Sequence, residues 1–177
     1  MDISIVIPAH NEESYLAKTL HSLKQQTYQD FETIIVTNGC TDKTYEIASN
    51  KTNDRIKHLD INVASVSRAR NYGASKAEGE VLVFLDADTT LETDALQKIN
   101  QQFSEKHSVA STLSKPDRST MWFNFLAGYK NFNFTTGIYK GCSGALVCRR
   151  EDFDKVNGYD PELKVREHRK LIQKLLE

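Results

Sequence analysis

The sequence predicts an α/β fold in which helices cover both faces of a mostly parallel sheet. Short apolar runs alternate with segments of helical periodicity along most of the chain up to residue 113, and residues 81–85 are apolar throughout. A run without polar residues is typical of a strand that is buried on both faces of a parallel sheet. Strands that are separated by helices are usually joined by crossovers, so neighbouring strands are expected to be parallel.

Length and composition predict a single globular domain. The chain has 177 residues, of which 39% are hydrophobic and 27% are charged. That length is enough for one α/β domain with a substantial core and too short for two ordinary domains. The formal net charge of −1 gives no bulk attraction to nucleic acid, so no nucleic-acid partner is expected.

The cysteines and the N-terminal segment predict a cytoplasmic protein. Cys40, Cys142 and Cys148 are odd in number and lack zinc-site spacing, which favours a reducing compartment. Met1 leads directly into an apolar segment without the basic region of a signal peptide. No segment approaches the roughly 20 apolar residues that a membrane-spanning helix needs.

The first strand is expected over residues 3–7, and we expect Pro8 to end it because proline cannot donate to a strand ladder. Asn11 is a favourable N-cap for the helix that follows, since acidic residues come next in the first turn. Leucines then recur at positions that share one face of that helix: Leu16, Leu20 and Leu23.

The next elements continue the alternation. Residues 31–36 predict a second strand, and Thr41 is a candidate cap for the helix after it. A strand at residues 56–59 and a helix at residues 65–77, ended by Gly79, are expected next. A strand at residues 81–85 and a helix at residues 93–105 are expected after them.

The alternation ends after a strand at residues 109–113. Residues 121–139 are rich in aromatic side chains, and Phe125, Tyr129 and Phe132 keep helical spacing. The favoured interpretation is one amphipathic helix packed on the core. The alternative is an acceptor-binding wall, because aromatic faces stack on sugar rings and contact lipid.

A late strand at residues 144–148 and a short helix at residues 150–156 follow. The last segment, from residue 161, carries an apolar stripe at helical spacing. The stripe is available either for packing or for a partner such as a second copy of the chain in a homodimer. Its members are Leu171, Ile172, Leu175 and Leu176.

Two carboxylates follow the central apolar run. Asp86 and Asp88 are separated by one small residue, so on an extended chain both side chains face the same side. Ligands of open α/β sheets bind outside the carboxyl ends of the strands, and carboxylate oxygens suit Mg²⁺ or Mn²⁺. An Asp-rich solvated turn explains the pair equally well when it is considered alone.

Asn38 and two arginines also lie where ligands are expected. The amide of Asn38 can hydrogen-bond with a base edge, or Asn38 can simply help the turn beside Gly39. Arg68 and Arg70 lie near the start of a helix, where positive charge opposes the helix dipole. An arriving anion would relieve that cost, whereas solvated surface arginines are the simpler explanation.

Several segments closely resemble the motifs of glycosyltransferase family 2, in the same order. They are residues 5–13, 26–28, 32–36, 38–44, 69–73, 85–88 and 149–160. Each motif alone is weak, but their order over almost the whole chain is specific. The resemblance is weakest at residues 114–139.

The resemblance implies the GT-A fold, a Rossmann-like three-layer α/β/α arrangement, as a single domain over residues 1–177. It implies a nucleotide-binding half at about residues 1–113 and an acceptor-side half at about 114–177. The implied activity is inverting, metal-dependent sugar transfer from a UDP- or GDP-sugar to a sugar, lipid-linked or polysaccharide acceptor. Such an enzyme is expected in the cytoplasm or at the cytoplasmic membrane face.

The resemblance also implies roles for individual residues. Pro8, His10 and Glu12 would lie along the nucleotide, Asn38 would meet the base, and Arg70 would contact the nucleotide. The acidic pair has two implied roles: Asp86 would hold the ribose or the metal, and Asp88 would coordinate the Mn²⁺ or Mg²⁺ bound to the diphosphate.

Two positions depart from the family pattern. Thr37 stands where the family commonly has Asp, which leaves the base preference open. Glu167 and His168 stand where the family usually has Glu-Asp with a catalytic base. His168 can act as the base or as a metal ligand, and Glu167 can instead supply the carboxylate. A surface helix with alternating charges would also explain this segment.

Two other functions compete with glycosyl transfer. A sugar-1-phosphate nucleotidyltransferase is disfavoured, because the segment after the first strand has no glycine and two acids, Glu12 and Glu13, where a Gly-rich basic loop is expected. A non-catalytic or truncated nucleotide-sugar-binding domain is the stronger alternative, since the Glu-Asp motif is altered and the chain is short.

Overall fold

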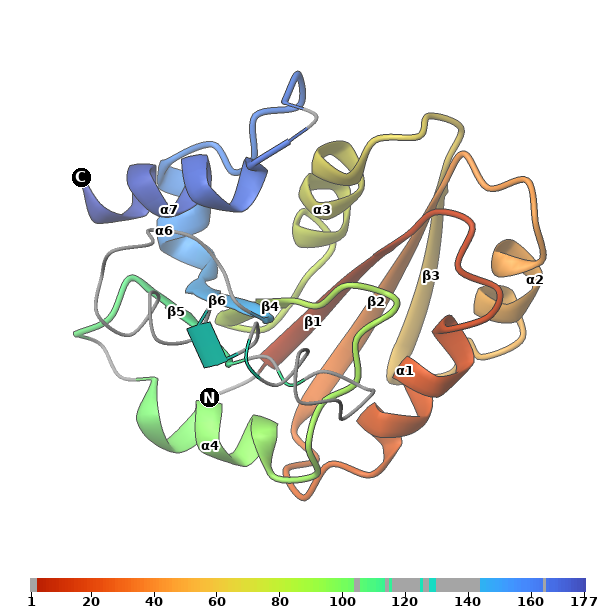
Figure 1. Ribbon diagram of the computed structural model, residues 1–177, viewed down its shortest axis with the longest axis horizontal. Helices are drawn as coiled ribbons and strands as arrows, with labels where there is room; N and C mark the ends of the chain where they lie inside the picture. The colour runs from red at the N-terminus through yellow and green to blue at the C-terminus, as the bar shows by residue number, and fades with distance from the viewer. Residues whose placement is uncertain are drawn as a thin grey trace.

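A computed structural model describes residues 3–103, 106–113, 144–163 and 165–177, together with residues 115, 125, 128 and 129. Six strands form one sheet in the order β3-β2-β1-β4-β6-β5 (Figure 1). The strands are β1 (Ile3–Ala9), β2 (Phe31–Asn38), β3 (Ile56–Ile61), β4 (Val81–Phe84), β5 (Val109–Ser111) and β6 (Leu146–Arg149).

The sheet is parallel except at one strand. β1 pairs in parallel with β2 and β4, and β2 pairs in parallel with β3, whereas β6 is antiparallel to both β4 and β5. Because parallel strands end at the same edge, the carboxyl ends of β1, β2, β3 and β4 lie side by side. The loops that carry the predicted site residues leave the sheet at this edge.

Helices cover both faces of the sheet. The described helices are α1 (Leu16–Lys24), α2 (Thr44–Ser49), α3 (Val66–Ala74), α4 (Ala95–Gln102), α6 (Arg150–Lys155) and α7 (Glu167–Leu176). Apolar residues of α1, α2 and α4 pack in one core cluster, and those of α3, α6 and α7 pack in another. The expected three-layer α/β/α arrangement with a mostly parallel sheet is therefore confirmed.

The stripe on the last helix belongs to the second core cluster. Leu171, Ile172 and Leu175 of α7 are buried there, and Leu176 is 64% exposed. Packing within the chain therefore uses most of the apolar face that a homodimer through this helix would need.

β1 runs through Pro8 and ends at Ala9, so the expectation that Pro8 ends the strand is wrong. The carbonyl of Val6 accepts a hydrogen bond from the backbone N–H of Leu85, on the β4 side. Pro8, two residues later, faces that same side, where β4 has already ended at Phe84. Its missing N–H therefore leaves no ladder bond unmade, and β2 continues to pair with β1.

Asn11 does not cap α1, which begins at Leu16 after Tyr15. Its backbone is left-handed, with φ at 56°, and its Oδ1 accepts a hydrogen bond from the backbone N–H of Thr41 at 2.8 Å. Thr41 in turn lies ahead of α2, which begins at Thr44. Both expected caps thus serve to tie the loop after β1 to the loop after β2.

The aromatic segment at residues 121–139 lies outside the described residues except for Phe125, Gly128 and Tyr129, which are exposed. Neither interpretation of that segment is tested. Within the described part of the chain, no helix is long and apolar enough to cross a bilayer.

The docking of α7 can be tested by stability measurements. Leu171→Ala should lower the free energy of unfolding by about 2–5 kcal/mol, because Leu171 is 1% exposed in the core. Leu176→Ala, on the same helix, should change it by no more than about 0.5 kcal/mol. Urea denaturation followed by circular dichroism measures both. Equal, small losses for the two variants would show that α7 does not pack on the sheet.

Candidate functional site

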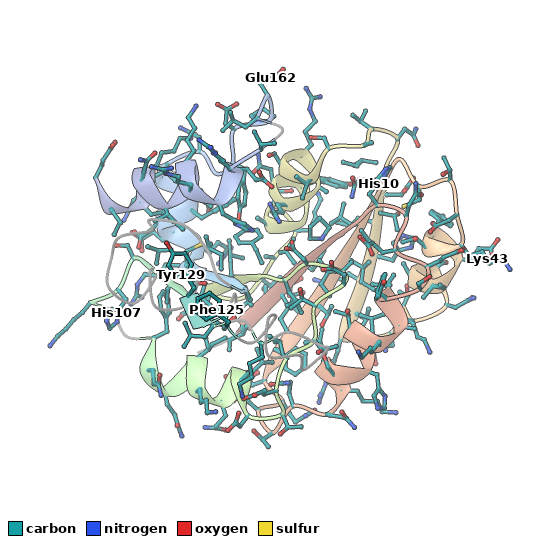
Figure 2. The ribbon with its side chains drawn as sticks, viewed as in Figure 1. His10, Lys43, His107, Phe125, Tyr129 and Glu162 are labelled. Carbon is teal, nitrogen blue, oxygen red and sulfur yellow. The ribbon has the colours of Figure 1, made fainter. Side chains whose placement is uncertain are left out.

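The loops after β1 and β2 are held together at the carboxyl edge of the sheet. His10, which projects from the loop after β1 (Figure 2), donates from Nδ1 to the carbonyl oxygen of Asn38 at 2.6 Å. Asn38 is 2% exposed, and its Nδ2 donates to the carbonyl oxygen of Ala9 at 3.0 Å. Asn38 therefore ties the end of β2 to the end of β1, and its contact with a base stays a prediction.

Asp86 and Asp88 lie exposed just beyond β4, and Ala87 between them is buried. The carbonyl oxygen of Ala87 accepts a hydrogen bond from Thr19 Oγ1 of α1 at 2.6 Å. This anchor holds the middle residue of the motif against the protein, while both acids lie on the solvent side. Residues 86–89 form a turn, in which the backbone N–H of Thr89 donates to the carbonyl oxygen of Asp86 at 3.0 Å, so both acids reach solvent from a turn and not from the extended chain that alternation assumes.

Glu12 lies within the electrostatic field of this pair. Its backbone N–H donates to Thr44 Oγ1 at 2.7 Å, which fixes the loop after β1 against the start of α2. Partial burial raises the pKa of Glu12, and the negative charges of Asp88, Asp42 and Asp86 raise it further. Negative charge is therefore concentrated at this edge of the sheet.

This donor set fits a hard divalent cation. The carboxylate oxygens of Asp86 and Asp88 are exposed, and Mg²⁺ and Mn²⁺ prefer such oxygen ligands. A cation would also relieve the repulsion that raises the pKa of Glu12. Among the described residues no group of three or more His, Cys, Asp or Glu side chains forms a complete cage. Phosphate oxygens or waters would have to supply the remaining ligands, as is usual for Mg²⁺.

Arg70 of α3 is buried and joins two carboxylates from distant parts of the chain. Its Nη2 donates to Asp86 Oδ1 at 2.7 Å, and its Nη1 donates to Glu167 Oε1 at 3.2 Å. The side chain of Arg70 is 3% exposed, whereas that of Asp86 is 54% exposed and that of Glu167 is 16% exposed. Arg70 therefore lies beneath Asp86 and does not protrude as a solvated surface arginine.

Tyr159 completes this buried group. The guanidinium carbon of Arg70 lies 5.2 Å from the centre of the Tyr159 ring. The Tyr159 hydroxyl is hydrogen-bonded to Nδ1 of His168 at 2.9 Å, and the two rings meet edge to face. Sequence reasoning assigned Tyr159 no role. A single aromatic residue after a turn glycine, Gly158, carries no local signal of a partner nine residues away.

The surroundings of His168 keep its imidazole neutral. Burial and, to a smaller extent, the positive charge of Arg70 lower the pKa of His168 to about 3, against the opposing effect of Asp86. A neutral imidazole has a lone pair for a metal or a proton, but it binds a proton weakly. The structure thus brings together Asp86, Arg70, Glu167 and His168, although the catalytic or binding role of each stays a prediction.

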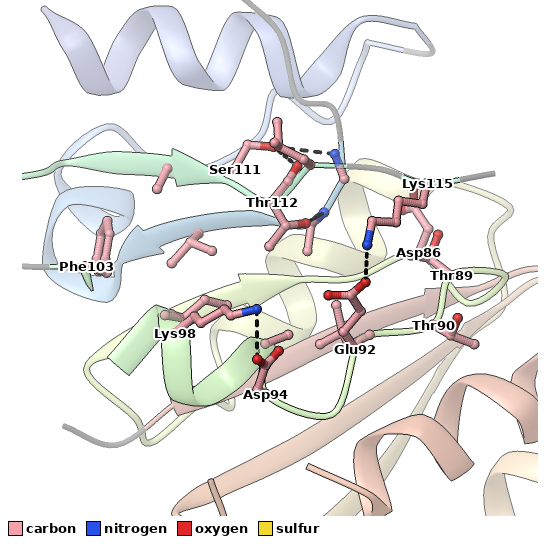
Figure 3. A pocket seen from close by; sticks show the side chains of 18 of the residues that line it. Asp86, Thr89, Thr90, Glu92, Asp94, Lys98, Phe103, Ser111, Thr112 and Lys115 are labelled. Atoms are coloured by element: carbon pink, nitrogen blue, oxygen red, sulfur yellow. Dashed lines mark hydrogen bonds and ion pairs between the residues drawn. The ribbon is translucent and has the colours of Figure 1, made fainter. Parts of the chain in front are cut away.

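A cavity of about 1460 Å³ extends from Asp86 and Asp88 along α4 to Phe103 and His107. Ion pairs between Lys98 and Asp94 and between Lys115 and Glu92 lie on its wall (Figure 3). Its lining mixes polar and apolar side chains. An opening of this size beside the acidic pair has room for a substrate.

The sheet topology and the acidic edge define a GT-A-type α/β domain. Residues 4–156 match the family model described as glycosyl transferase family 2. The chain belongs to glycosyltransferase family 2, as its motifs indicated.

Curated relatives match about three fifths of the chain. Poly(ribitol-phosphate) beta-N-acetylglucosaminyltransferase TarS of Staphylococcus aureus is 31% identical over 113 residues, which cover 61% of this chain and 20% of that protein. Glycosyltransferase GlyA of Streptococcus pneumoniae is 32% identical over 105 residues, which cover 58% of this chain and 15% of that protein. The matched region is thus a small part of these longer relatives.

Solved structures match nearly the whole chain in fold. S. aureus TarS 1-349 in complex with UDP-GlcNAc superposes with a TM-score of 0.74 at 21% identity, covering 99% of this chain and 53% of that one. Mannosyltransferase PcManGT from Pyrobaculum calidifontis, in complex with GDP-Man and Mn²⁺, gives 0.75 at 17% identity, covering 98% and 51%. The chain spans about half of each.

The buried ion pairs of Arg70 can be tested against a matched neighbour. Arg70→Ala should lower the free energy of unfolding by about 3 kcal/mol, since it leaves Glu167 without its buried partner. The exposed half of Asp86 keeps this figure at the lower end of the usual range. Arg68 lies on the same helix as Arg70 and makes an exposed ion pair with Glu162. Arg68→Ala should therefore lower the free energy of unfolding by no more than about 1 kcal/mol. Urea titrations that gave the same loss for both variants would contradict the assignment.

Proposed function

We propose that the chain transfers a sugar from a nucleotide diphosphate sugar, a UDP- or GDP-sugar, to an acceptor hydroxyl with inversion, using Mn²⁺ or Mg²⁺. One observation carries the proposal: Arg70 joins the acidic end of β4 to the α7 residues that stand at the family's base position. A donor diphosphate at Asp86 and Asp88 would then lie near Glu167 and His168. The bound nucleotide sugars of the TarS and PcManGT structures support this choice of donor.

Asp88 and Asp86 would hold the cation, with His168 as a further candidate ligand. A diphosphate beside two carboxylates is strongly repelled: like unit charges at ~4 Å cost about 4 kcal/mol at an effective dielectric near 20. When bound, the cation would neutralise that charge and stabilise the diphosphate as a leaving group. Asp88 is the freer ligand, because Arg70 already engages Oδ1 of Asp86.

Pro8, His10 and Glu12 would line the nucleotide from the loop after β1, and Asn38 would support that loop from below. Arg70 would act on the nucleotide through Asp86, which it holds in place, since little of Arg70 reaches the surface. The 1460 Å³ cavity beyond Asp88 would receive the acceptor.

Glu167 and His168 are the candidates for the base that removes the acceptor proton on the face opposite the leaving group. Arg70 donates a hydrogen bond to Oε1 of Glu167 and so orients it near Asp86, and Tyr159 orients the ring of His168 through Nδ1. Both residues therefore have defined orientations at this end of the site, and kinetics can separate them.

A nucleotide-sugar-binding domain without turnover is the second candidate function. Burial lowers the pKa of His168 to about 3, so its imidazole is a weak base. Arg70 already engages Oε1 of Glu167, the other candidate base. A donor-hydrolysis and transfer assay with a panel of nucleotide sugars, with and without Mn²⁺, separates the two functions.

Asp88→Asn tests the cation assignment. Because Asp88 is exposed, the variant should keep its thermal stability but lose the Mn²⁺-dependent part of UDP or GDP binding. Isothermal titration with and without Mn²⁺ measures this part. Asp54→Asn is the control: it removes the same charge just ahead of the amino end of β3, at the other end of the strands. This variant should bind UDP or GDP as the parent does. Parental Mn²⁺-dependent affinity in Asp88→Asn would refute the metal role.

Glu167→Gln and His168→Ala test the base. Loss of turnover by 100-fold or more, roughly the contribution of a general base, with unchanged nucleotide affinity identifies the residue that accepts the proton. Loss of Mn²⁺-dependent binding identifies a metal ligand instead. Both quantities come from initial-rate kinetics and titration on the same preparations. Full activity in both variants would remove α7 from the catalytic assignment.

A further inference from the structure

A second, smaller cavity lies at the carboxyl ends of β2 and β3. Its volume is about 290 Å³, and it is lined by Gly39, Cys40, Tyr45, Asp60, Ile61 and Asn62. It is distinct from the large cavity beside α4, with which it shares no lining residue. No residue role proposed above uses it.

A hydrogen-bond relay fixes the carboxylate at this cavity. Thr37 Oγ1 lies 2.6 Å from Asp60 Oδ1, 2.9 Å from His58 Nε2 and 3.2 Å from the carbonyl oxygen of Leu59. A hydroxyl has one hydrogen to donate, and a carboxylate only accepts. The two shorter contacts are satisfied when Nε2–H of His58 donates to Thr37 and Thr37 donates to Asp60, which is the nearer of its two acceptors. Burial lowers the pKa of His58, against the opposing effect of Asp60, and so favours a neutral imidazole that can carry its proton on Nε2.

The rest of Asp60 is available to a ligand. Thr37 is completely buried, while Asp60 is exposed at the end of β3, in register with Thr37. Within the described part of the chain, Asp60 has no ion pair, and Oδ2 has no hydrogen-bond partner. The half-exposed ring of Tyr45 lines the same cavity, and its edge-to-face contact with His58 holds it there. An oriented carboxylate beside an aromatic ring suits a flat, hydrogen-bonding ligand.

The position of the cavity matches one end of a nucleoside diphosphate. Asp60 lies at the end of β3, and the acidic pair lies at the end of β4. These two strands are three strand spacings apart in the sheet, a distance of about 14 Å. A nucleotide lying across the strand ends with its diphosphate at Asp86 and Asp88 would extend its base toward β2 and β3. The loop that carries His10 lies between the two ends, since it is bonded to Asn38 at the end of β2.

We propose that this cavity takes the nucleobase of the donor and that Asp60, oriented by Thr37, selects bases with a ring N–H. Uracil and guanine present such a donor to a carboxylate. Cytosine and adenine instead present a ring nitrogen lone pair, which a carboxylate repels. The inference rests on the proposed function, and it assigns the choice among donors to a residue of β3.

The test compares four nucleoside diphosphates in Mn²⁺ by isothermal titration. The parent should bind UDP or GDP at least tenfold more tightly than CDP and ADP, roughly the value of one hydrogen bond to a charged group. Asp60→Asn keeps an acceptor for Thr37 but turns an amide donor toward the base. The variant should bind UDP or GDP about tenfold more weakly and CDP more tightly than the parent, so that the preference for UDP or GDP narrows or reverses.

Two further variants examine the relay. Thr37→Val removes the hydroxyl at nearly constant volume and should narrow the preference for UDP or GDP over CDP and ADP. Thr37→Ser keeps the hydroxyl and should therefore keep that preference. Asp54→Asn loses the same charge at the amino end of β3 and should leave the ranking of the four nucleotide affinities unchanged. Circular dichroism confirms that each variant is folded, and the Thr37 pair decides the matter if Asp60→Asn is unstable.

Each outcome bears on the inference in a defined way. An Asp60→Asn variant with the parental ranking overturns the role of Asp60 and leaves the proposed glycosyl transfer intact. A parent that prefers CDP or ADP overturns the role of Asp60 and also the choice of a UDP- or GDP-sugar as the donor, but not sugar transfer from a nucleotide diphosphate sugar. A parent that binds none of the four nucleotides in Mn²⁺ overturns both the role of Asp60 and the proposed glycosyl transfer. Loss of the ranking in Asp60→Asn and Thr37→Val, with its retention in Thr37→Ser, supports the inference.

Discussion

The buried guanidinium of Arg70 is the interaction on which the arrangement of the site depends. A cation in the interior is tolerated only when anions and hydrogen-bond acceptors surround it, and here the anions are Asp86 and Glu167. One follows the central strand and the other begins the last helix, 81 positions later in the chain. Pairing both with one side chain of α3 sets where α7 lies relative to the end of β4. Within the described part of the chain the buried Nε of Arg70 has no hydrogen-bond partner, so the charge of Arg70 is compensated through its two Nη atoms and the face of the Tyr159 ring.

This arrangement divides the negative charge at the edge into two parts. Arg70 compensates much of the charge of Asp86 and Glu167, whereas Asp88 and Glu12 face solvent without an ion pair among the described residues. The excess raises the pKa of Glu12 and favours a cation at this place. Electrostatics and topology thus point to the same location for a metal-bound diphosphate. The position of Arg70 under Asp86, and not in the solvent, is what produces this division.

The edge of the sheet also supplies separate environments for the parts of a nucleotide. The acidic end of β4 suits a bound cation, and the loop after β1 is fixed to β2 through His10 and Asn38. The end of β3 carries a carboxylate that Thr37 orients. A parallel sheet brings these groups together because every strand ends at the same side, although the residues are far apart in sequence. The loss of Asp at position 37 therefore need not remove a carboxylate from this region, since Asp60 lies one strand away.

Periodicity and composition were sufficient to predict the α/β class, the leucine face of α1 and the buried central strand. Each is a local property: an apolar run or a helical repeat restricts which face is buried, whatever the partner. The roles of Pro8 and Asn11 were mispredicted, because they depend on where β4 ends and on which loop lies beside the turn. The burial of Arg70, the contact of Tyr159 with His168 and the relay from His58 to Asp60 were decided only by the tertiary structure. These contacts join residues whose spacing in the sequence carries no signal, and packing alone determines whether such a charge meets solvent or a partner.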